Sequence, residues 1–354
     1  MSILFSPLTI GATTFRNRLW VAPMCQYSAT DGMPGEWHHV HLAQFASGGA
    51  GLVVSEAAAV SPEGRISPED VGIWNDAQQA AWAPIASAIR SRGAVAGIQL
   101  AHAGRKASTW SPFSGERGTV PSDRGGWQTV APSAVAFDGY ATPAELDHTG
   151  IDHVVANFAS AARRAAAAGF TVLEIHAAHG YLLHQFLSPL SNLRTDGYGG
   201  SFENRTRLLR RVVTAVKDAA PAALVAVRFS ATDWADGGWD VDDTVRAAAL
   251  VQDLGAELID VSSGGLVAHQ QITTGPGYQV PFAAAVRAGV DIAVNAVGMI
   301  DTGALAEEVL ARGDADAIMS AREWLRDPHF ALRAAGELGA DVSWPPQYER
   351  ARRR

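Results

Sequence analysis

The feature that most constrains the fold is a repeat of eight short apolar runs, each followed by a longer polar or amphipathic stretch. The runs are rich in Val, Ile and Leu, as strands of a parallel sheet buried on both faces must be. Several of the intervening stretches begin at Asp, Asn or Thr and end before a Gly, which are helix-capping signals. Eight such β-then-α units predict a closed (β/α)₈ barrel of the TIM type, an α/β fold, rather than an open sheet.

The strands predicted in this way are residues 18–22, 52–57, 95–100, 172–176, 224–229, 258–262, 292–297 and 317–320. The helices predicted between them include residues 76–91, 152–168, 204–219, 242–254 and 303–311. Barrels of this kind often exceed 200 residues as one unit, so we expect residues 1–354 to form a single domain.

Two segments lie outside the repeat. Residues 3–5 and 14–15 flank a polar turn near Gly11, which predicts an N-terminal β-hairpin that closes the barrel floor. Residues 105–147 form a long polar loop after the third strand, rich in Gly, Pro and Trp. We expect this loop on the C-terminal face of the barrel, where long loops are often functional.

Composition narrows the class of protein further. The net charge of −8 argues against a nucleic-acid or anionic-membrane partner. The single cysteine, Cys25, permits neither an internal disulfide nor a Cys-ligated cluster. The N-terminus lacks a signal-peptide pattern, and there is no run of 18 uncharged apolar residues. We therefore expect a cytoplasmic protein.

Barrel geometry predicts where the chemistry lies. Active-site residues of such barrels stand at the C-terminal ends of the strands and in the loops that follow. In this chain, polar and titratable residues crowd those ends although the strands are apolar. They are Cys25, Gln26, Tyr27, Glu56, Gln99, His102, Arg105, His176, His179, Tyr181, Arg228, Ser262, Ser263 and Arg322.

The most informative of these ends carries two histidines three residues apart and a tyrosine two residues further on. A helical turn after His176 would place His176 and His179 on one face. Their ring N–H groups could then hold one oxygen and stabilise developing negative charge, with Tyr181 as proton donor. Two alternatives stay open: buried core histidines, or metal ligands, which would need a third ligand.

Cys25 follows the first strand, and its residue type admits three roles. It is either a buried small hydrophobe, a nucleophile that would need a nearby base, or a weak S–H donor to a cofactor ring.

Arg228 ends an apolar strand, where a cation needs a partner. That partner is either an electron-rich ring or, inside the barrel, the carboxylate of Glu174 or Asp260.

The last two predicted strands end in Val297-Gly298 and Ser320-Ala321-Arg322. Loops after strands seven and eight are the usual phosphate site of such barrels. Arg322 would add a charge-assisted hydrogen bond to the phosphate.

Several long motifs, in the same order, resemble those of the old yellow enzymes, and within them the bacterial thermophilic-like ene-reductases. The motifs are residues 23–27 (PMCQY), 97–106 (GIQLAHAGRK), 176–181 (HAAHGY), 194–205 (RTDGYGGSFENR) and 347–350 (QYER).

The resemblance implies one FMN-binding barrel domain with non-covalent FMN and NADPH as reductant. NADPH would reduce FMN and leave. Hydride would then pass from flavin N5 to Cβ of an activated alkene, and a proton from Tyr181 to Cα. The substrates would be small enones, enals, maleimides or nitroalkenes.

The resemblance also assigns residues. His176 and His179 would hold the substrate oxygen, Tyr27 would line the pocket, and Cys25 would modulate the flavin potential. Arg350 would reach the neighbouring active site of a homodimer or homotetramer. The residues expected to contact FMN are Pro23, Met24, Cys25, Ala57, Gln99, Arg228, Ser263, Gly298, Ala321 and Arg322.

The chain departs from the family pattern at three positions. Ala22 stands where Ser is frequent, and Asn295 and Ala321 stand where Gly is frequent in the phosphate loops. These changes bear on FMN affinity. Two competing hypotheses remain: a metal- or phosphate-dependent barrel lyase or hydrolase that uses His176 and His179, and a flavin-binding redox sensor that acts through Cys25.

Overall fold

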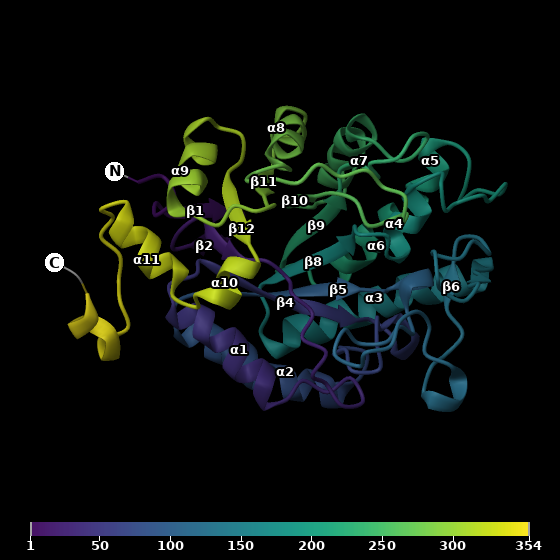
Figure 1. Cartoon of the computed structure of the whole chain (residues 1–354), viewed down its shortest axis with the longest axis horizontal. Helices are drawn as coiled ribbons and strands as arrows, with labels where there is room; N and C mark the ends of the chain where they lie inside the picture. Colours follow the sequence, from purple (N-terminus) through teal and green to yellow (C-terminus); the bar gives the residue numbers. More distant parts are fainter. Residues whose placement is uncertain (1, 353–354) are drawn as a thin grey trace.

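The computed structural model describes residues 2–352 and shows a closed barrel of eight parallel strands surrounded by helices (Figure 1). Around the barrel the strands follow the order β10, β11, β12, β3, β4, β5, β8, β9. Their bounds are β3 Leu19–Val21, β4 Leu52–Ala59, β5 Val95–Ala101, β8 Val172–Ala177, β9 Leu224–Ser230, β10 Leu258–Ser262, β11 Ala293–Ala296 and β12 Ala317–Ser320. All eight predicted strands are confirmed, with ends that differ by at most two residues.

The helices are α1 Glu36–Ser47, α2 Asp76–Ser91, α3 His148–Ala168, α4 Leu182–Leu187, α5 Phe202–Arg205, α6 Arg207–Ala219, α7 Val241–Asp253, α8 Val280–Ala288, α9 Gly303–Ala311, α10 Arg322–Arg326 and α11 Phe330–Glu337. The predicted capping signals act as expected. Asn75, Asp240 and Thr302 each accept a backbone N–H in the first turn of α2, α7 and α9. Gly169, after α3, has a φ of +97°, the left-handed value that a helix end favours.

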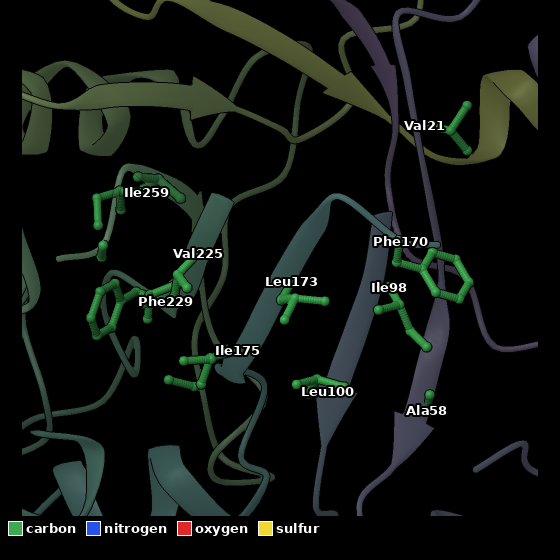
Figure 2. Close-up of a cluster of buried hydrophobic side chains, with 14 of the residues drawn as sticks. Val21, Ala58, Ile98, Leu100, Phe170, Leu173, Ile175, Val225, Phe229 and Ile259 are labelled. Carbon is green, nitrogen blue, oxygen red and sulfur yellow. The ribbon is translucent and has the colours of Figure 1, made fainter. Parts of the chain in front are cut away.

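Side chains along each strand alternate between the barrel interior and the layer beneath the helices. On β9, Val225 and Phe229 belong to the large apolar cluster under the helices, and Figure 2 shows both beside side chains of β8. Ala226, between them, belongs to the smaller cluster inside the barrel. Because side chains alternate along a strand, Arg228, two residues after Ala226, also points into the barrel.

The barrel interior changes from apolar at the floor to polar at the mouth. Residues in the lower part are Val172, Leu224, Ala226 and Leu258. The next interior positions are Glu174, Arg228 and Asp260, followed by His176, Ser230 and Ser262. Polar side chains thus fill the barrel interior near the C-terminal ends of the strands. This polar layer places the candidate site at the mouth.

A hairpin closes the floor, but its first strand is not the predicted one. β1 (Leu8–Ile10) pairs with β2 (Thr13–Phe15) across a short turn at Gly11. Ile10 and Phe15 join the apolar cluster inside the barrel, as a plug must. The predicted strand at residues 3–5 is wrong because its backbone N–H groups at Ile3 and Leu4 bond the Glu307 carboxylate instead.

The long loop after β5 packs at the mouth, where it was expected, and contains the short strands β6 (Val130–Ala131) and β7 (Ala144–Glu145). Arg105 ties it down by donating to Val135 O (3.1 Å) and to Leu266 O (2.7 Å). Within residues 2–352, no helix is long and apolar enough to cross a membrane.

Candidate active site

Three aromatic rings gather at the end of β8. The His176 and His179 ring centroids are 5.1 Å apart, and those of His176 and Tyr181 are 5.0 Å apart, both edge to face. Ser262 Oγ lies 2.7 Å from His179 Nε2. His176 Nδ1 is buried and has no hydrogen-bond partner within residues 2–352. An unpartnered buried nitrogen is costly, so a ligand that bonds it would be stabilised here.

The three rings meet for a different reason from the one predicted. The chain does not turn helically after His176. Instead His179 and Gly180 adopt left-handed φ values of +57° and +74°, and α4 begins only at Leu182. A left-handed conformation is strained for His, so the surroundings must hold it. Gly265 lies against this turn, and a Cβ on it would come within 2.7 Å of His179 backbone atoms.

Three side chains that sequence reasoning did not assign hold this turn. Lys106 Nζ donates to His179 O and to Gly265 O, both at 2.9 Å. His184 Nδ1 accepts from Gly180 N (2.9 Å), and Gln185 Nε2 donates to Gly180 O (2.7 Å). Lys106 is the last residue of the 97–106 motif. A charged residue in an otherwise buried motif is the sequence signal that could have identified Lys106 as part of the site.

His184 is itself held beside a buried carboxylate. Its Nε2 lies 2.9 Å from Asp233 Oδ1, and both side chains are fully buried. Asp233 Oδ2 accepts from Ser188 Oγ (2.6 Å) and from Trp239 N (2.8 Å). The left-handed turn at His179 and Gly180 is thus held by contacts from several elements.

Burial controls the protonation of the three rings. Burial and the Arg228 guanidinium hold the pKa of His176 and of His179 well below 6.5, so both imidazoles are neutral N–H donors near neutral pH. Burial, followed by the nearby Cys25 and Tyr27, raises the pKa of Tyr181 well above 10. Tyr181 therefore keeps its proton and can donate it.

The surroundings of Cys25 keep its thiol protonated. Burial, Asp70 and Glu56 raise the pKa of Cys25 well above 9. The side chain packs in a small apolar cluster with Ala57 and Tyr181. A protonated thiol beside the mouth disfavours the nucleophile interpretation and suits a weak S–H donor.

Arg228 makes the ion pair that one interpretation of the sequence expected. Its Nε lies 3.0 Å from Asp260 Oδ2 inside the barrel. Gln99, from β5, donates through Nε2 to Glu174 Oε1 at 2.7 Å. Asn295 was predicted in a phosphate loop, and this is wrong: it lies within β11, fully buried, opposite Asp260 in the strand register.

The ends of β11 and β12 form a second part of the mouth. Gly298 has a φ of +121°, and a Cβ there would meet Gln279 Nε2 at 2.8 Å, so glycine is required. Ser263 Oγ donates to Gln279 Oε1 (2.6 Å). Ala321 has a φ of −115°, so the position does not need the positive φ that favours glycine, and the exposed Arg322 begins α10. The Gly-to-Ala departure at 321 therefore leaves the backbone donor intact.

The remaining predicted residues fall into two groups. Pro23, Met24 and Cys25 follow β3 at the mouth, beside Ala57 of β4. Tyr27 meets Phe113 of the long loop edge to face, with ring centroids 6.0 Å apart. Arg350 instead lies on the exposed C-terminal segment Pro346–Ala351, on the opposite side of the molecule from β6 (Figure 1).

Metal ligation was the basis of the competing lyase or hydrolase hypothesis. Within residues 2–352, no group of three or more His, Cys, Asp or Glu side chains is arranged to hold a metal ion. Family membership, rather than this finding, decides between the hypotheses.

The two loops after β11 and β12, a buried arginine and two neutral histidines lie around one barrel mouth, the arrangement of an enzyme that binds a phosphate-bearing ligand in a (β/α)₈ barrel. Residues 3–340 match the model of the NADH:flavin oxidoreductase / NADH oxidase family. The NADPH dehydrogenase of Bacillus subtilis (strain 168) is 47% identical over 350 residues, 98% of each chain. That of Listeria innocua serovar 6a is 47% identical over 354 residues, 99% of each chain.

Comparison with solved structures supports the same family. Morphinone reductase superposes with a TM-score of 0.80 at 30% identity, over 98% of this chain and 92% of its own. The old yellow enzyme homologue from Zymomonas mobilis gives 0.79 at 32% identity, over 97% of both chains. The chain belongs to the NADH:flavin oxidoreductase / NADH oxidase family, the family of the old yellow enzymes. It is an oxidoreductase that uses FMN, with NADPH as reductant.

Proposed function

We propose that this oxidoreductase is an ene-reductase that reduces the activated C=C bond of small enones, enals, maleimides or nitroalkenes. The observation that carries the proposal is the cluster of His176, His179 and Tyr181, with two neutral imidazoles and a protonated phenol at one mouth. Such a cluster holds an oxygen acceptor and offers a proton beside it.

In this proposal the two imidazoles donate hydrogen bonds to the carbonyl or nitro oxygen of the substrate. Because both are neutral, they stabilise the negative charge that develops on that oxygen without losing a proton. Tyr181 donates its proton to the α-carbon, and Tyr27 lines the pocket. FMN, when bound and reduced by NADPH, would supply the hydride to the β-carbon.

The residues around the mouth fit FMN. The left-handed Gly298, the Ser263–Gln279 hydrogen bond and the exposed Arg322 suit a phosphate end. Pro23, Met24, Cys25, Ala57, Gln99 and Arg228 would contact the ring and ribityl chain, with Ser263, Gly298, Ala321 and Arg322 at the ribityl–phosphate end. We propose that residues 1–354 act as one domain in binding it.

Cys25 would tune the flavin as a protonated thiol. Its raised pKa opposes the competing redox-sensor hypothesis, because redox-sensing cysteines are thiolates near neutral pH.

Arg350 would serve the active site of a neighbouring copy in a homodimer or homotetramer. The segment Pro346–Ala351 lies far from the mouth of its own barrel, and Tyr348 packs on His329 with ring centroids 5.4 Å apart (Figure 1). Sedimentation would give the oligomeric state. If Arg350 acts across subunits, R350A should raise KM for enones without changing FMN content.

Steady-state NADPH oxidation with cyclohexenone or a maleimide tests the main proposal. Tyr181→Phe and His176→Ala should each lower kcat/KM by about 10²-fold or more while FMN stays bound. Tyr198→Phe is the matched control, since the Tyr198 hydroxyl bonds Arg211 (2.7 Å) outside this cluster. Wild-type turnover in Tyr181→Phe and His176→Ala would refute the assigned roles.

A further inference from the structure

A buried polar network lies one interior layer below the site histidines, and most of it has no role in the proposal above. Glu174 and Asp260 are fully buried, and the Arg228 side chain is 7% exposed. These groups come from three adjacent strands, β8, β9 and β10. Two carboxyl groups and one guanidinium thus share a space closed to water.

The contacts differ for the two carboxyl groups. Asp260 Oδ2 lies 3.0 Å from Arg228 Nε. With its amide nitrogen turned toward Asp260, Asn295 donates to Asp260 Oδ1 (2.9 Å) and to Ile259 O (3.2 Å). Glu174 receives one donor, Gln99 Nε2 at 2.7 Å. Asp260 therefore faces two donor groups, one of them charged, whereas Glu174 faces one neutral donor.

Charge in this space is limited by burial. Two carboxylates beside one guanidinium would leave a net buried negative charge, which is costly. Burial and Asp260 raise the pKa of Glu174 to about 8, against the opposing effect of Arg228. Near neutral pH the pair therefore shares one proton, held by Glu174, and Asp260 carries the negative charge.

We propose that Asp260 and Glu174 are positioning residues for Arg228 and Gln99, and that the single negative charge of this pair sets the reduction potential of bound FMN. The inference rests on the proposed function in one respect, the placement of Arg228 and Gln99 against the flavin. The single negative charge of the Asp260–Glu174 pair offsets the positive charge of the Arg228 guanidinium. Glu174 also holds the Gln99 amide nitrogen, which leaves the Gln99 carbonyl oxygen for the cofactor.

The two carboxyl groups should respond differently to isosteric replacement. Asp260→Asn alone would let Glu174 ionise in its place, so the counter-charge is removed by combining Asp260→Asn with Glu174→Gln. In this double variant an uncompensated Arg228 favours reduced FMN, which carries the added electrons. We expect reduced FMN to bind at least about tenfold more tightly relative to oxidised FMN, which raises the midpoint potential by about 30 mV. Glu174→Gln replaces a neutral acid by a neutral amide and should change this ratio less than about threefold at pH 6.5.

The potentials are measured by dye-equilibrated reduction of the purified holoenzymes. Asp316→Asn is the matched control, because Asp316 precedes β12 at the opposite end of the barrel from the site and pairs with Arg287, so it should leave the potential unchanged. A shift in the double variant D260N/E174Q that is negative, or no larger than in E174Q alone, overturns the inference. R228M tests the underlying placement: if it leaves the FMN potential and affinity unchanged, the proposed function has placed Arg228 wrongly.

A second measurement does not depend on the folding of the double variant. As pH rises through the pKa of Glu174, the pair gains its second negative charge, so the wild-type potential should fall more steeply with pH than that of E174Q. The groups that face Glu174 are Gln99 from β5, Arg228 from β9 and Asp260 from β10, and His176 follows it on β8 as a neutral ring. Parallel pH dependences of the two potentials would overturn the inference.

Discussion

Gly180 separates the two groups that the proposed reaction needs, His179 and Tyr181, and it is the sharpest place to perturb the site. Its φ is +74°, and a Cβ built there would lie 2.2 Å from Gly265 O and 2.9 Å from Leu266 Cα. Ordinary contacts between carbon and a carbonyl oxygen begin at about 3.3 Å. In Gly180→Ala one of the two backbone segments must therefore retreat by about 1 Å.

The magnitude follows from two effects. A left-handed conformation costs an L-residue about 1–2 kcal/mol, which should appear as lost stability toward urea. A shift of about 1 Å in a catalytic group can cost about 10²-fold in rate, or about 2.7 kcal/mol of transition-state stabilisation. We expect kcat/KM for cyclohexenone to fall about 100-fold, while the visible absorption of bound FMN persists.

The control variant Gly313→Ala separates the effect of backbone strain from the effect of displaced catalytic groups. Gly313 has a nearly equal φ of +76° and lies between α9 and β12, and a Cβ placed on it would meet no atom of residues 2–352 within 4 Å. This variant should lose the same amount of stability, about 1–2 kcal/mol, and keep wild-type kcat/KM. Wild-type turnover in Gly180→Ala, or equal activity losses in both variants, would refute the reasoning.

Two further predictions concern protonation and buried charge. The pKa of His176 lies well below 6.5 in the folded chain, so its neutral ring contributes stability above pH 6.5 that is lost as pH falls. Urea unfolding at pH 7.0 and 5.5 should show a smaller loss for His176→Asn than for wild type, by up to about 1.4 kcal/mol per pH unit; equal losses would contradict this. His184→Ala should cost about 3–5 kcal/mol because the fully buried Asp233 Oδ1 loses the ring nitrogen that faces it, and Ser188 and Trp239 contact only Oδ2. His148→Ala breaks an exposed pair with Asp196 and should cost less than about 1 kcal/mol, so similar losses in the two variants would argue against the buried pair.

The elements and the main site residues were predictable because they depend on local pattern and on one geometric rule. Strands buried on both faces read as short apolar runs, and capping residues mark the helix ends. A parallel barrel brings all strand ends to one mouth, so His176, Arg228 and Gly298 could be placed there from their positions alone.

What could not be predicted depends on contacts between distant segments. The left-handed turn at His179 exists because Lys106, 73 residues earlier, and Gly265 close around it. Asn295 lies inside the strand that the apolar pattern predicted at residues 292–297, and it was misplaced because its assignment to a phosphate loop followed the family resemblance instead. The hairpin partner was wrong because Glu307, far along the chain, takes the backbone donors of Ile3 and Leu4.

The way in which the barrel closes also bears on how the chain folds during synthesis. The first barrel strand, β3, completes the ring by pairing with the last, β12: Ile318 N donates to Arg18 O (2.8 Å) and Ala22 N to Ser320 O (2.9 Å). Until the ribosome has released residues 317–320, β3 and β11 are unpaired edges that can recruit other chains. The nascent protein is therefore exposed to aggregation for nearly the whole of its translation, and only the arrival of its last barrel strand removes that exposure.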